Sequence, residues 1–318
     1  MTGFDRIDPA ALRGGLRAAA SLLEPGSFRA GVKQSAVRLM PGLAAPGPTE
    51  TLGRLGSLEV RLAAGRKEIK RAQKLRFKVF FEEGAAIPMG LAGLKRRDID
   101  AYDDVCDHLL VLDHEVRPKR FRAHKPKVVG TYRLLRQSEA EARDGFYTAG
   151  EFDIAPLLAA QPGLEFLELG RSCVLAPYRG RKTIELLWQG IWAYVQAHGI
   201  GAMIGCASLE GTNPDRLAPQ LSYLHHFASS PEPWRVRALA DRYVAMDRVG
   251  REAIDARAAL VSLPPLVKAY LRVGATVGDG AVVDRQFGTT DVFVVMPVAA
   301  ISSRYVSYFG PTANRCAA

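Results

Sequence analysis

A strand, a short basic turn and a long amphipathic helix follow one another directly between residues 166 and 198. Residues 166–175 form a mainly apolar run of the length expected for a buried strand. After the turn, apolar side chains recur at helical spacing on one face: Ile184, Leu187, Trp188, Ile191, Trp192 and Val195. A helix with such a face must pack it against another element, and the preceding strand is at hand. This unit predicts an α/β fold.

The alternation of strands and helices continues on both sides of this unit. Apolar or alternating runs predict further strands at 57–62, 108–112, 128–135, 202–207 and 292–298. Helical periodicity predicts helices over 65–81 and 263–273. We therefore expect a mixed sheet with helices packed on it, without internal repeats.

The expected folded domain covers residues 53–300 and is flanked by segments of different composition. Residues 1–52 are rich in Ala, Gly, Pro and Arg, and residues 12–40 can form short amphipathic helices with a basic polar side. Two interpretations stay open for this leader: a poorly ordered segment, or one that touches anionic lipid. Residues 301–318 form a short C-terminal tail.

Cysteine spacing and apolar run lengths exclude several classes of protein. The four cysteines are scattered without a CxxC pair, which argues against a disulfide framework or structural zinc and favours a reducing compartment. No apolar stretch approaches the roughly 18–20 residues of a membrane span. The acidic, Gly-containing start does not resemble a secretory signal. We expect a cytoplasmic protein that at most touches the inner membrane surface.

The formal net charge of +10 points to an acidic partner of some kind. Such a surplus suits nucleic acid, an anionic membrane face or an acidic protein. Composition alone does not choose among them.

The basic turn before the long helix has the features of a phosphate site. Backbone N–H groups and the positive end of the dipole point outward at a helix start. Thr183 is a candidate cap for this helix. The candidate phosphate ligands are Arg179, Gly180, Arg181, Lys182 and Thr183. A capped helix with solvated basic residues would have the same sequence, so both readings stand on this segment alone.

Several motifs in order carry a family resemblance. The strand, turn and helix resemble the acyl-donor unit of the GNAT acetyltransferase superfamily. The segments LRFKVFFEE (75–83), DVCDHLLVLD (104–113), VVGTYRLL (128–135), GEFDIAP (150–156) and LELGRSCV (167–174) follow the order seen in acyl-homoserine-lactone synthases. The segments CASLEGTNP (206–214), LSYLHH (221–226), LPPLVKAYLRVGATVGDGAVVD (263–284) and TTDVFVVMPV (289–298) resemble the ornithine-acyl-carrier-protein N-acyltransferases. The resemblance covers roughly residues 55–300.

This resemblance implies both a fold and a reaction. The fold is GNAT-like, with a mixed, partly splayed central sheet and helices on both faces. The reaction moves a 3-hydroxyacyl chain from acyl carrier protein to the α-amine of L-ornithine, giving lyso-ornithine lipid in ornithine lipid biosynthesis. The donor is the carrier's phosphopantetheine thioester, and no tightly bound cofactor or metal is expected. Lys182 replaces the small residue that GNAT proteins usually place two positions after the loop glycine, which favours a single phosphate over the pyrophosphate of CoA.

The chemistry of the reaction and the family pattern suggest the catalytic residues. Attack by a neutral amine needs a base, for which Glu168 is the first candidate, with Arg171 nearby; a structural ion pair is the alternative for the two. Strand alternation places them on opposite faces unless a bulge intervenes. The superfamily has such a bulge, whose N–H polarises the thioester carbonyl. Ser208 or Tyr223 is a candidate proton donor to the leaving thiolate.

An amino-acid acceptor needs partners for its own charges. Arg76 and Arg133 are candidates for its carboxylate, because arginine forks onto carboxylates. Asp104 and Asp107 are candidates for the side-chain ammonium of ornithine. With Glu168 and Arg171, these four correspond to the polar core of the lactone-synthase pattern.

Three other motifs are interpreted as structural. His108 and Asp113 form an HxxxxD pattern, but the apolar residues between them predict a strand that points the two side chains apart. Cys206 lies in an apolar strand, where cysteines are mostly inert, so we expect direct amine attack without an acyl-enzyme. His225 and His226 lack a third ligand at suitable spacing for a metal site.

The positive net charge and the family resemblance together suggest which partners the protein binds, and they leave alternative functions open. Basic residues of the donor turn and of residues 117–127 can dock the acidic carrier and face an anionic membrane; no nucleic acid is expected. The rival functions are an acyl-homoserine-lactone synthase, a CoA-dependent small-group acetyltransferase, and a non-catalytic module that binds nucleic acid or membrane.

Overall fold

The computed structural model describes residues 45–47, 49–115, 125–301 and 305. The predicted leader therefore lies mostly outside the described residues. So does the C-terminal tail, apart from Ile301 and Tyr305. The described helices and strands run from Gly53 to Ala300.

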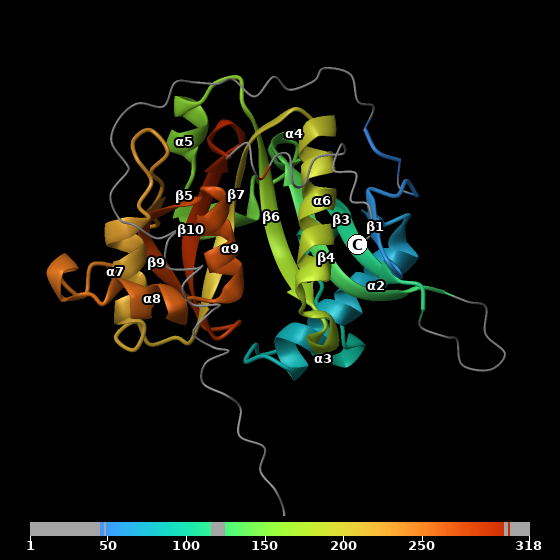
Figure 1. Ribbon diagram of the computed structural model, residues 1–318, viewed down its shortest axis with the longest axis horizontal. Helices are drawn as coiled ribbons and strands as arrows, with labels where there is room; N and C mark the ends of the chain where they lie inside the picture. The colour runs from blue at the N-terminus through green and yellow to red at the C-terminus, as the bar shows by residue number, and fades with distance from the viewer. Residues whose placement is uncertain (1–44, 48, 116–124, 302–304, 306–318) are drawn as a thin grey trace, which may run out of the picture. The chain divides into compact units, whose positions relative to one another are not determined.

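In the described part of the chain, ten strands form one mixed sheet in the order β1-β2-β3-β4-β6-β7-β10-β9-β8-β5 (Figure 1). Their bounds are β1 Gly53–Leu55, β2 Leu58–Leu62, β3 Asp107–Asp113, β4 Lys127–Arg136, β5 Phe152–Asp153, β6 Glu165–Val174, β7 Ile200–Glu210, β8 Arg237–Ala238, β9 Thr276–Asp284 and β10 Thr289–Pro297. Neighbouring strands pair antiparallel except β6 with β7 and β8 with β9, which pair parallel.

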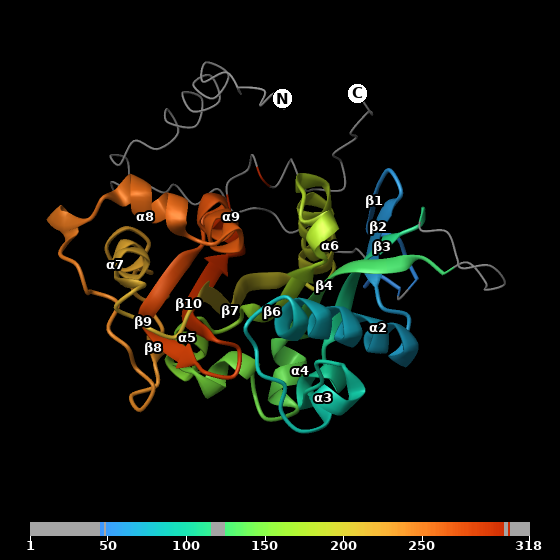
Figure 2. The ribbon, with the colours of Figure 1, turned by 90° about the horizontal axis from the view of Figure 1, so that it is seen from below.

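Helices cover both faces of this sheet, as Figure 2 shows: α6 and α9 lie on one face, and α2, α4 and α5 lie on the other. The α-helices are α2 Arg66–Phe77, α3 Leu91–Lys95, α4 Gln137–Glu141, α5 Ala155–Ala160, α6 Arg181–Ala197, α7 Ala218–Phe227, α8 Ala256–Ser262 and α9 Pro265–Val273. The shorter helical turns are η1 Lys78–Glu82, η2 Ala101–Asp104, η3 Tyr147–Gly150, η4 Ala176–Tyr178, η5 Arg251–Ala253 and η6 Val298–Ala300.

The predicted apolar face of α6 is buried against the sheet except at Ile184 in the first turn, which is 40% exposed. Leu187, Ile191 and Val195 belong to the main apolar core together with β2 and β3. Gly190 permits the close approach, because a Cβ there would lie 2.8 Å from Val60 Cγ2 and 2.9 Å from Leu109 Cδ1. This packing fixes the start of α6 beside the end of β6, where the site is built.

Some boundaries differ from the expectation for local reasons. The helix predicted over 65–81 is α2 followed by the π-helical turn η1. Helix α6 begins at Arg181, with Gly180 as its N-cap in extended conformation. The predicted cap Thr183 is therefore wrong: it lies inside the first turn and is buried. Strand β9 was not expected, because two glycines, Gly278 and Gly280, interrupt its apolar pattern.

Candidate active site

Strand β6 carries a bulge at Arg171. The register between β4 and β6 shifts between Thr131 and Arg133, and Arg171 has a left-handed φ of 50°. This conformation is rare for a residue with a Cβ and marks a constrained position. The bulge brings Arg171 to the same acidic group, Asp100, that Arg133 contacts. The expected bulge is therefore present. Within the described residues Arg171 pairs with Asp98 and Asp100 rather than with Glu168, so the structural ion pair considered for Glu168 and Arg171 is not formed.

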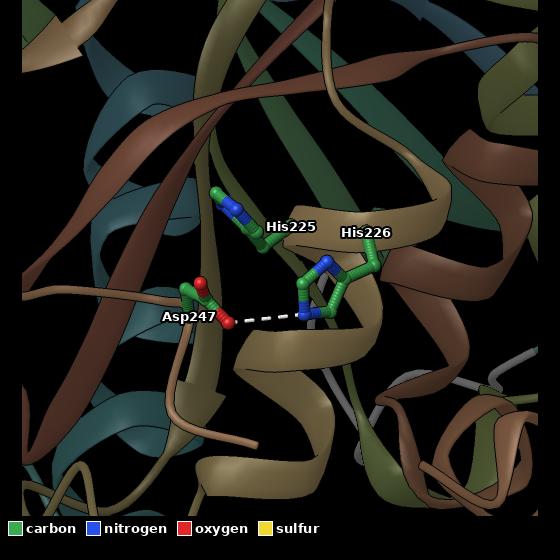
Figure 3. Close-up of side chains that lie close together, drawn as sticks. All are labelled: His225, His226 and Asp247. Atoms are coloured by element: carbon green, nitrogen blue, oxygen red, sulfur yellow. Dashed lines mark ion pairs between the residues drawn. The ribbon is translucent and has the colours of Figure 1, made fainter. Parts of the chain in front are cut away.

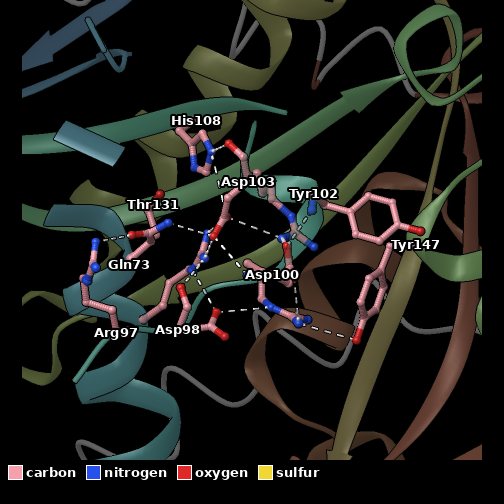
Figure 4. Close-up of polar contacts among 12 residues, drawn as sticks. Gln73, Arg97, Asp98, Asp100, Tyr102, Asp103, His108, Thr131 and Tyr147 are labelled. Carbon is pink, nitrogen blue, oxygen red and sulfur yellow. Dashed lines mark hydrogen bonds and ion pairs between the residues drawn. The ribbon is translucent and has the colours of Figure 1, made fainter. Parts of the chain in front are cut away.

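Arginines and aspartates form a largely buried ionic cluster that includes Arg171. Its members are Arg76, Arg133, Arg171, Asp98, Asp100 and Asp103. Figure 4 labels the three aspartates. The innermost arginine, Arg76, is 0% exposed. Its Nε lies 2.8 Å from Asp98 Oδ2, and its Nη1 lies 2.8 Å from Asp103 Oδ1. Gln73 Nε2 also donates to Asp103. Burial alone would raise the pKa of Asp103, but hydrogen bonds and charge from Arg76 lower it to about 2.

Arg133 and Arg171 complete the ionic cluster on its outer side. Arg133 Nη1 donates to both oxygens of Asp100, at 2.5 and 2.7 Å. Arg171 Nε lies 3.3 Å from Asp98 Oδ2, and its Nη2 lies 3.2 Å from Asp100 Oδ2. Since Arg76 and Arg133 are buried and Arg171 is partly exposed, Arg171 is the arginine of the three that faces outward.

Aromatic rings enclose the outer arginine. The guanidinium of Arg171 lies 4.8 Å from the centroid of the Tyr147 ring and 4.7 Å from that of Phe287. Phe287 belongs to the β9–β10 hairpin, and the backbone N–H of Ile87 donates to the neighbouring Gln286 carbonyl at 2.7 Å. The hairpin and the segment after η1 therefore meet next to Arg171.

Glu168 holds η3 against β6. Its Oε2 accepts from the Tyr147 N–H at 2.9 Å, and its Oε1 accepts from the Thr148 N–H at 2.6 Å and from the Thr148 hydroxyl. Burial raises the pKa of Glu168, and the Thr148 hydrogen bonds oppose that rise. Both oxygens of this predicted base are thus occupied within the protein. The geometry suits a positioning residue that sets the place of Tyr147.

Strands β6 and β7 separate beyond Glu168. Their parallel pairing runs only from Glu165 with Ile200 to Glu168 with Ile204, although both strands continue. At the point of separation Gly205 lies against β6, since a Cβ there would be 2.5 Å from the Leu169 carbonyl oxygen. An apolar pocket, here termed the splay pocket, occupies the separation and is lined by Leu169, Met203, Ile204, Gly205, Cys206, Tyr270, Val294 and Met296.

Tyr270 contributes a phenol to the lining of the splay pocket. It was not among the residues predicted from the sequence. Its hydroxyl is hydrogen-bonded to that of Tyr132, and burial raises its pKa well above the ordinary value. The predicted donor Tyr223 instead lies on α7, stacked on Phe227. Ser208 is exposed on β7 and pairs across to Asp291 on β10. The Leu263–Val273 helix was expected, and Val267, Tyr270 and Val273 share its buried face at helical spacing, which is the signal that could have placed Tyr270 against the sheet.

Two predicted acceptor-binding aspartates lie outside the ionic cluster. Asp104 is exposed. Asp107 accepts a hydrogen bond from Tyr194 of α6 at 2.7 Å. The cluster uses Asp98, Asp100 and Asp103 in their place, which lie in the segment just before β3. The role of these residues toward substrate stays a prediction.

The donor turn places its basic side chains around the start of α6. Arg179 Nη2 donates to Glu83 at 2.6 Å, and Arg181 Nε donates to Glu185 at 2.5 Å. Lys182 is exposed. Because Gly180 offers no side chain to cap the helix, the first N–H groups of α6 are left for another acceptor.

The contacts of His108 and of Cys206 agree with the structural roles that the sequence predicted for them. His108 is buried, and its Nε2 donates to the Asp103 carbonyl at 3.0 Å, whereas Asp113 accepts from Tyr178. The thiol of Cys206 lies 3.5 Å from Glu151 Oε2, and burial, together with nearby carboxylates, raises its pKa well above 9.0. A thiol in that environment is a poor nucleophile.

Comparison with known proteins identifies the family. Residues 75–189 match the model of the acetyltransferase (GNAT) domain. The L-ornithine N(alpha)-acyltransferase of Brucella abortus (strain 2308) is 52% identical over 272 residues, covering 86% of this chain and 95% of that protein. The protein of the same name from Rhizobium meliloti (strain 1021) is 50% identical over 273 residues, covering 86% and 90%. The chain belongs to the L-ornithine N(alpha)-acyltransferase family.

Membership of this family makes the protein an acyltransferase with a GNAT-like fold, as the sequence predicted. Among solved structures, the N-acyl amino acid synthase FeeM from uncultured soil microbes is similar, with a TM-score of 0.42 and 11% identity over 76% of this chain and 91% of that chain. None of the helices that the structure describes is long and apolar enough to cross a membrane.

In this acyltransferase the paired histidines meet an aspartate that the sequence did not link to them. His225, His226 and Asp247 can each direct one atom into a space where these atoms lie within 4.8 Å of one another (Figure 3). However, His226 Nε2 faces two acceptors, Asp247 Oδ1 at 3.0 Å and the Val249 carbonyl at 3.1 Å. Nε2 must carry a proton to donate to these oxygens, and a protonated nitrogen cannot bind a metal ion. We therefore interpret His226 as a structural residue that attaches the loop at Asp247 and Val249 to α7.

Proposed function

We propose that this chain transfers a 3-hydroxyacyl group from acyl carrier protein to the α-amine of L-ornithine, forming lyso-ornithine lipid. The observation that carries the proposal is the identity of 50% or more with L-ornithine N(alpha)-acyltransferases over most of the chain. The separation of β6 and β7 next to a fixed arginine supplies the geometry such a reaction needs.

The donor and the acceptor would approach from opposite faces of the sheet. Tyr270 lies on α9, on the same face as α6, where the donor turn begins. The ionic cluster, which includes Arg76 of α2, extends to the other face. The thioester would lie where β6 and β7 separate, next to the splay pocket, whose volume of about 10 Å³ is too small to hold it by itself. The carrier's single phosphate would meet the N–H groups at Gly180, with Arg179, Arg181 and Lys182 adding charge.

The chemical step is direct attack of a neutral α-amine on the thioester carbon. A C–N bond forms and the C–S bond breaks, the amine loses a proton, and the leaving thiolate gains one. A bulged residue leaves the strand ladder, so an N–H near Arg171 can donate to the developing oxyanion. Tyr270 is positioned in the pocket to protonate the thiolate.

Arg171 is the best-placed group for the acceptor's carboxylate. Its side chain is 13% exposed, more than those of Arg76 and Arg133, and Tyr147, Asp98 and Asp100 fix its orientation. Arg76 and Arg133 would then act through the ionic cluster rather than by touching substrate. Glu168, which holds Tyr147, would position this group and not act as the base.

The partners follow from the chemistry of donor and product. An acidic carrier protein would dock on the basic face at the donor turn, and the lipid product would leave toward a membrane surface. We propose a cytoplasmic enzyme with peripheral contact to the inner membrane, without nucleic-acid binding and without a tightly bound cofactor.

A reconstituted assay tests the proposal. Purified protein is incubated with 3-hydroxypalmitoyl carrier protein and a panel of amino acids, and products are identified by mass spectrometry. We expect acylated ornithine that carries its acyl group on the α-nitrogen. A lactone product from S-adenosylmethionine, or turnover with acetyl-CoA in place of the carrier, would overturn it.

A further inference from the structure

Three carboxylates that the proposed chemistry does not use lie together beside the splay pocket. Glu151 follows η3, Asp284 ends β9, and Asp291 lies in β10. One oxygen from each lies within 4.8 Å of the others. These residues, here termed the carboxylate triad, fall in the segments GEFDIAP, GDGAVVD and TTDVFVVMPV that carried the family resemblance.

Two carboxylates of the triad, Glu151 and Asp291, are buried, whereas Asp284 is partly exposed and its Oδ1 accepts from the N–H groups of Gln286 and Phe287. Glu151 and Asp291 are 5% and 7% exposed. Arg242 Nη2 lies 3.5 Å from Glu151 Oε1. Asp291 Oδ1 accepts no hydrogen bond from the residues that the structure describes. A buried carboxylate oxygen without a donor is costly, so Asp291 Oδ1 offers an open acceptor position toward the other two carboxylates.

The pKa values of two carboxylates in the triad are raised by burial and by their negative neighbours. Burial and the neighbouring Asp291 raise the pKa of Glu151 to about 7. Burial likewise raises the pKa of Asp291; the side chains of Ser208 and Thr289 oppose this rise, and Asp284 adds to it. A bound cation would remove this repulsion and restore both groups to their charged form.

The carboxylate triad is next to the place where the thioester would sit. Cys206 lines the splay pocket, and its sulfur lies 3.5 Å from Glu151 Oε2. A ligand held by the triad is thus separated from the pocket by a single side chain. Thr148, which Glu168 anchors, lies 3.7 Å from the same sulfur, so η3 connects the triad with Tyr147 and Arg171.

The donor that fits three carboxylates is a primary ammonium group. An alkylammonium has three N–H donors in tetrahedral arrangement, and three oxygens at hydrogen-bond distance from its nitrogen lie roughly 4.6 Å apart. We propose that the carboxylate triad binds the side-chain ammonium of the acceptor and so selects ornithine over neutral amino acids. This inference rests on the proposed function, since it assigns a subsite for the same acceptor.

The kinetic test compares ornithine with norvaline, which has the same carbon chain without the terminal amine. The variants are Glu151→Gln, Asp284→Asn and Asp291→Asn, each of which removes one charge and keeps the size. We expect each to raise the KM for ornithine roughly 10- to 100-fold, as is typical for loss of a charged hydrogen bond, and to leave turnover of norvaline unchanged. The control Asp153→Asn, on exposed Asp153 two residues after Glu151, should behave like the unaltered protein.

A binding test without acyl donor separates this inference from the proposed reaction. Ornithine should raise the Tm of the unaltered protein and of Asp153→Asn, and should have a smaller effect on the three variants. Norvaline should give a much smaller shift in all of them. If ornithine stabilises the protein in this pattern but no acylated ornithine forms, the proposed function fails and the subsite stands.

Three results would overturn the subsite. The first is an unchanged preference for ornithine over norvaline in all three variants. The second is an equal loss of kcat for both acceptors in Glu151→Gln, which would make Glu151 a base instead. The third is a Tm increase with Mg²⁺ or Ca²⁺ that the three variants lose and that ornithine does not reproduce, which would make the triad a metal site.

Discussion

Glu168 accepts three hydrogen bonds from η3, and we predict that its main contribution is to structure. Glu168→Gln replaces one acceptor oxygen with an amide that meets an N–H donor. Unfolding in urea should show a loss of about 1–3 kcal/mol. The acceptor KM should rise, whereas the pH profile of kcat/KM should keep its shape. A normal Tm combined with loss of the acidic limb of that profile would instead support the base assignment.

The raised pKa of Glu151 predicts a pH-dependent stability. Its neighbours are Asp284, Asp291, Arg242 and Cys206. The folded protein holds a proton on Glu151 up to a pKa of about 7, whereas the unfolded chain releases it near 4.5. Stability from this group is therefore present below pH 4.5 and declines as pH rises to 7, by about 3 kcal/mol.

Urea unfolding at several pH values measures this effect as the difference between the unaltered protein and Glu151→Gln. The variant should gain relative stability from pH 4.5 to 7.5 and remain level above that range. A difference that does not change with pH would show that Glu151 is ionised in the folded protein.

Tyr270 and Tyr223 form a matched pair for testing thiolate protonation. Tyr270→Phe removes the hydroxyl in the splay pocket and should lower kcat roughly 100-fold, in the range for a lost general acid. Tyr223→Phe changes a ring stacked on Phe227 and should leave kcat unchanged. Steady-state kinetics with the acyl carrier substrate measures both, and the opposite ranking would restore the sequence-based assignment.

At the scale of elements, the close approach of β7 to β6 at the point where the strands separate depends on a glycine. Gly205→Ala would place a Cβ 2.5 Å from the Leu169 carbonyl oxygen, and backbone cannot yield as a side chain can. We expect a loss of about 1–3 kcal/mol in urea unfolding and reduced activity. Gly250→Ala is the control, because nothing lies within 4 Å of its Cβ position. Equal stability of the two variants would show that the strands can shift without cost.

The bulge in β6 shows how an element can change the meaning of a sequence pattern. Strict alternation would direct Arg133 and Arg171 to opposite faces, because Arg133 pairs with Gly170. The left-handed conformation of Arg171 removes one residue from the ladder and brings both guanidinium groups to Asp100. The strand alone did not reveal this; the expected bulge came from the resemblance to a family.

At the scale of the molecule, the charge of +10 predicts salt-sensitive recognition of an acidic carrier. Lys182 is exposed at the start of α6. Lys182→Glu should lower kcat/KM for the acyl carrier roughly 10-fold at low salt, and less at 0.5 M salt, because screening weakens such encounters. The control Lys67→Glu makes the same charge change on exposed Lys67 of α2. An equal effect in both variants would indicate general charge steering without a local docking site.

The sequence by itself determined the elements that periodicity can encode. The amphipathic face of α6, the apolar runs of the central strands and the ordered family motifs sufficed for a GNAT-like α/β fold and an acyltransferase of this family. These features are local, because each depends on residues a few positions apart. The basic turn before α6 was visible for the same reason, although its cap was assigned to Thr183 instead of Gly180.

Tertiary structure alone decided which polar groups meet. Asp98, Asp100 and Asp103 replaced Asp104 and Asp107 in the ionic cluster, because the turn before β3 selects which acidic residues face inward. Tyr270 reached the splay pocket from a distant helix. Glu151 meets Asp284 and Asp291, although at least 133 positions of the sequence separate it from them. Such contacts depend on sheet order and on the separation of β6 from β7, which no local pattern encodes.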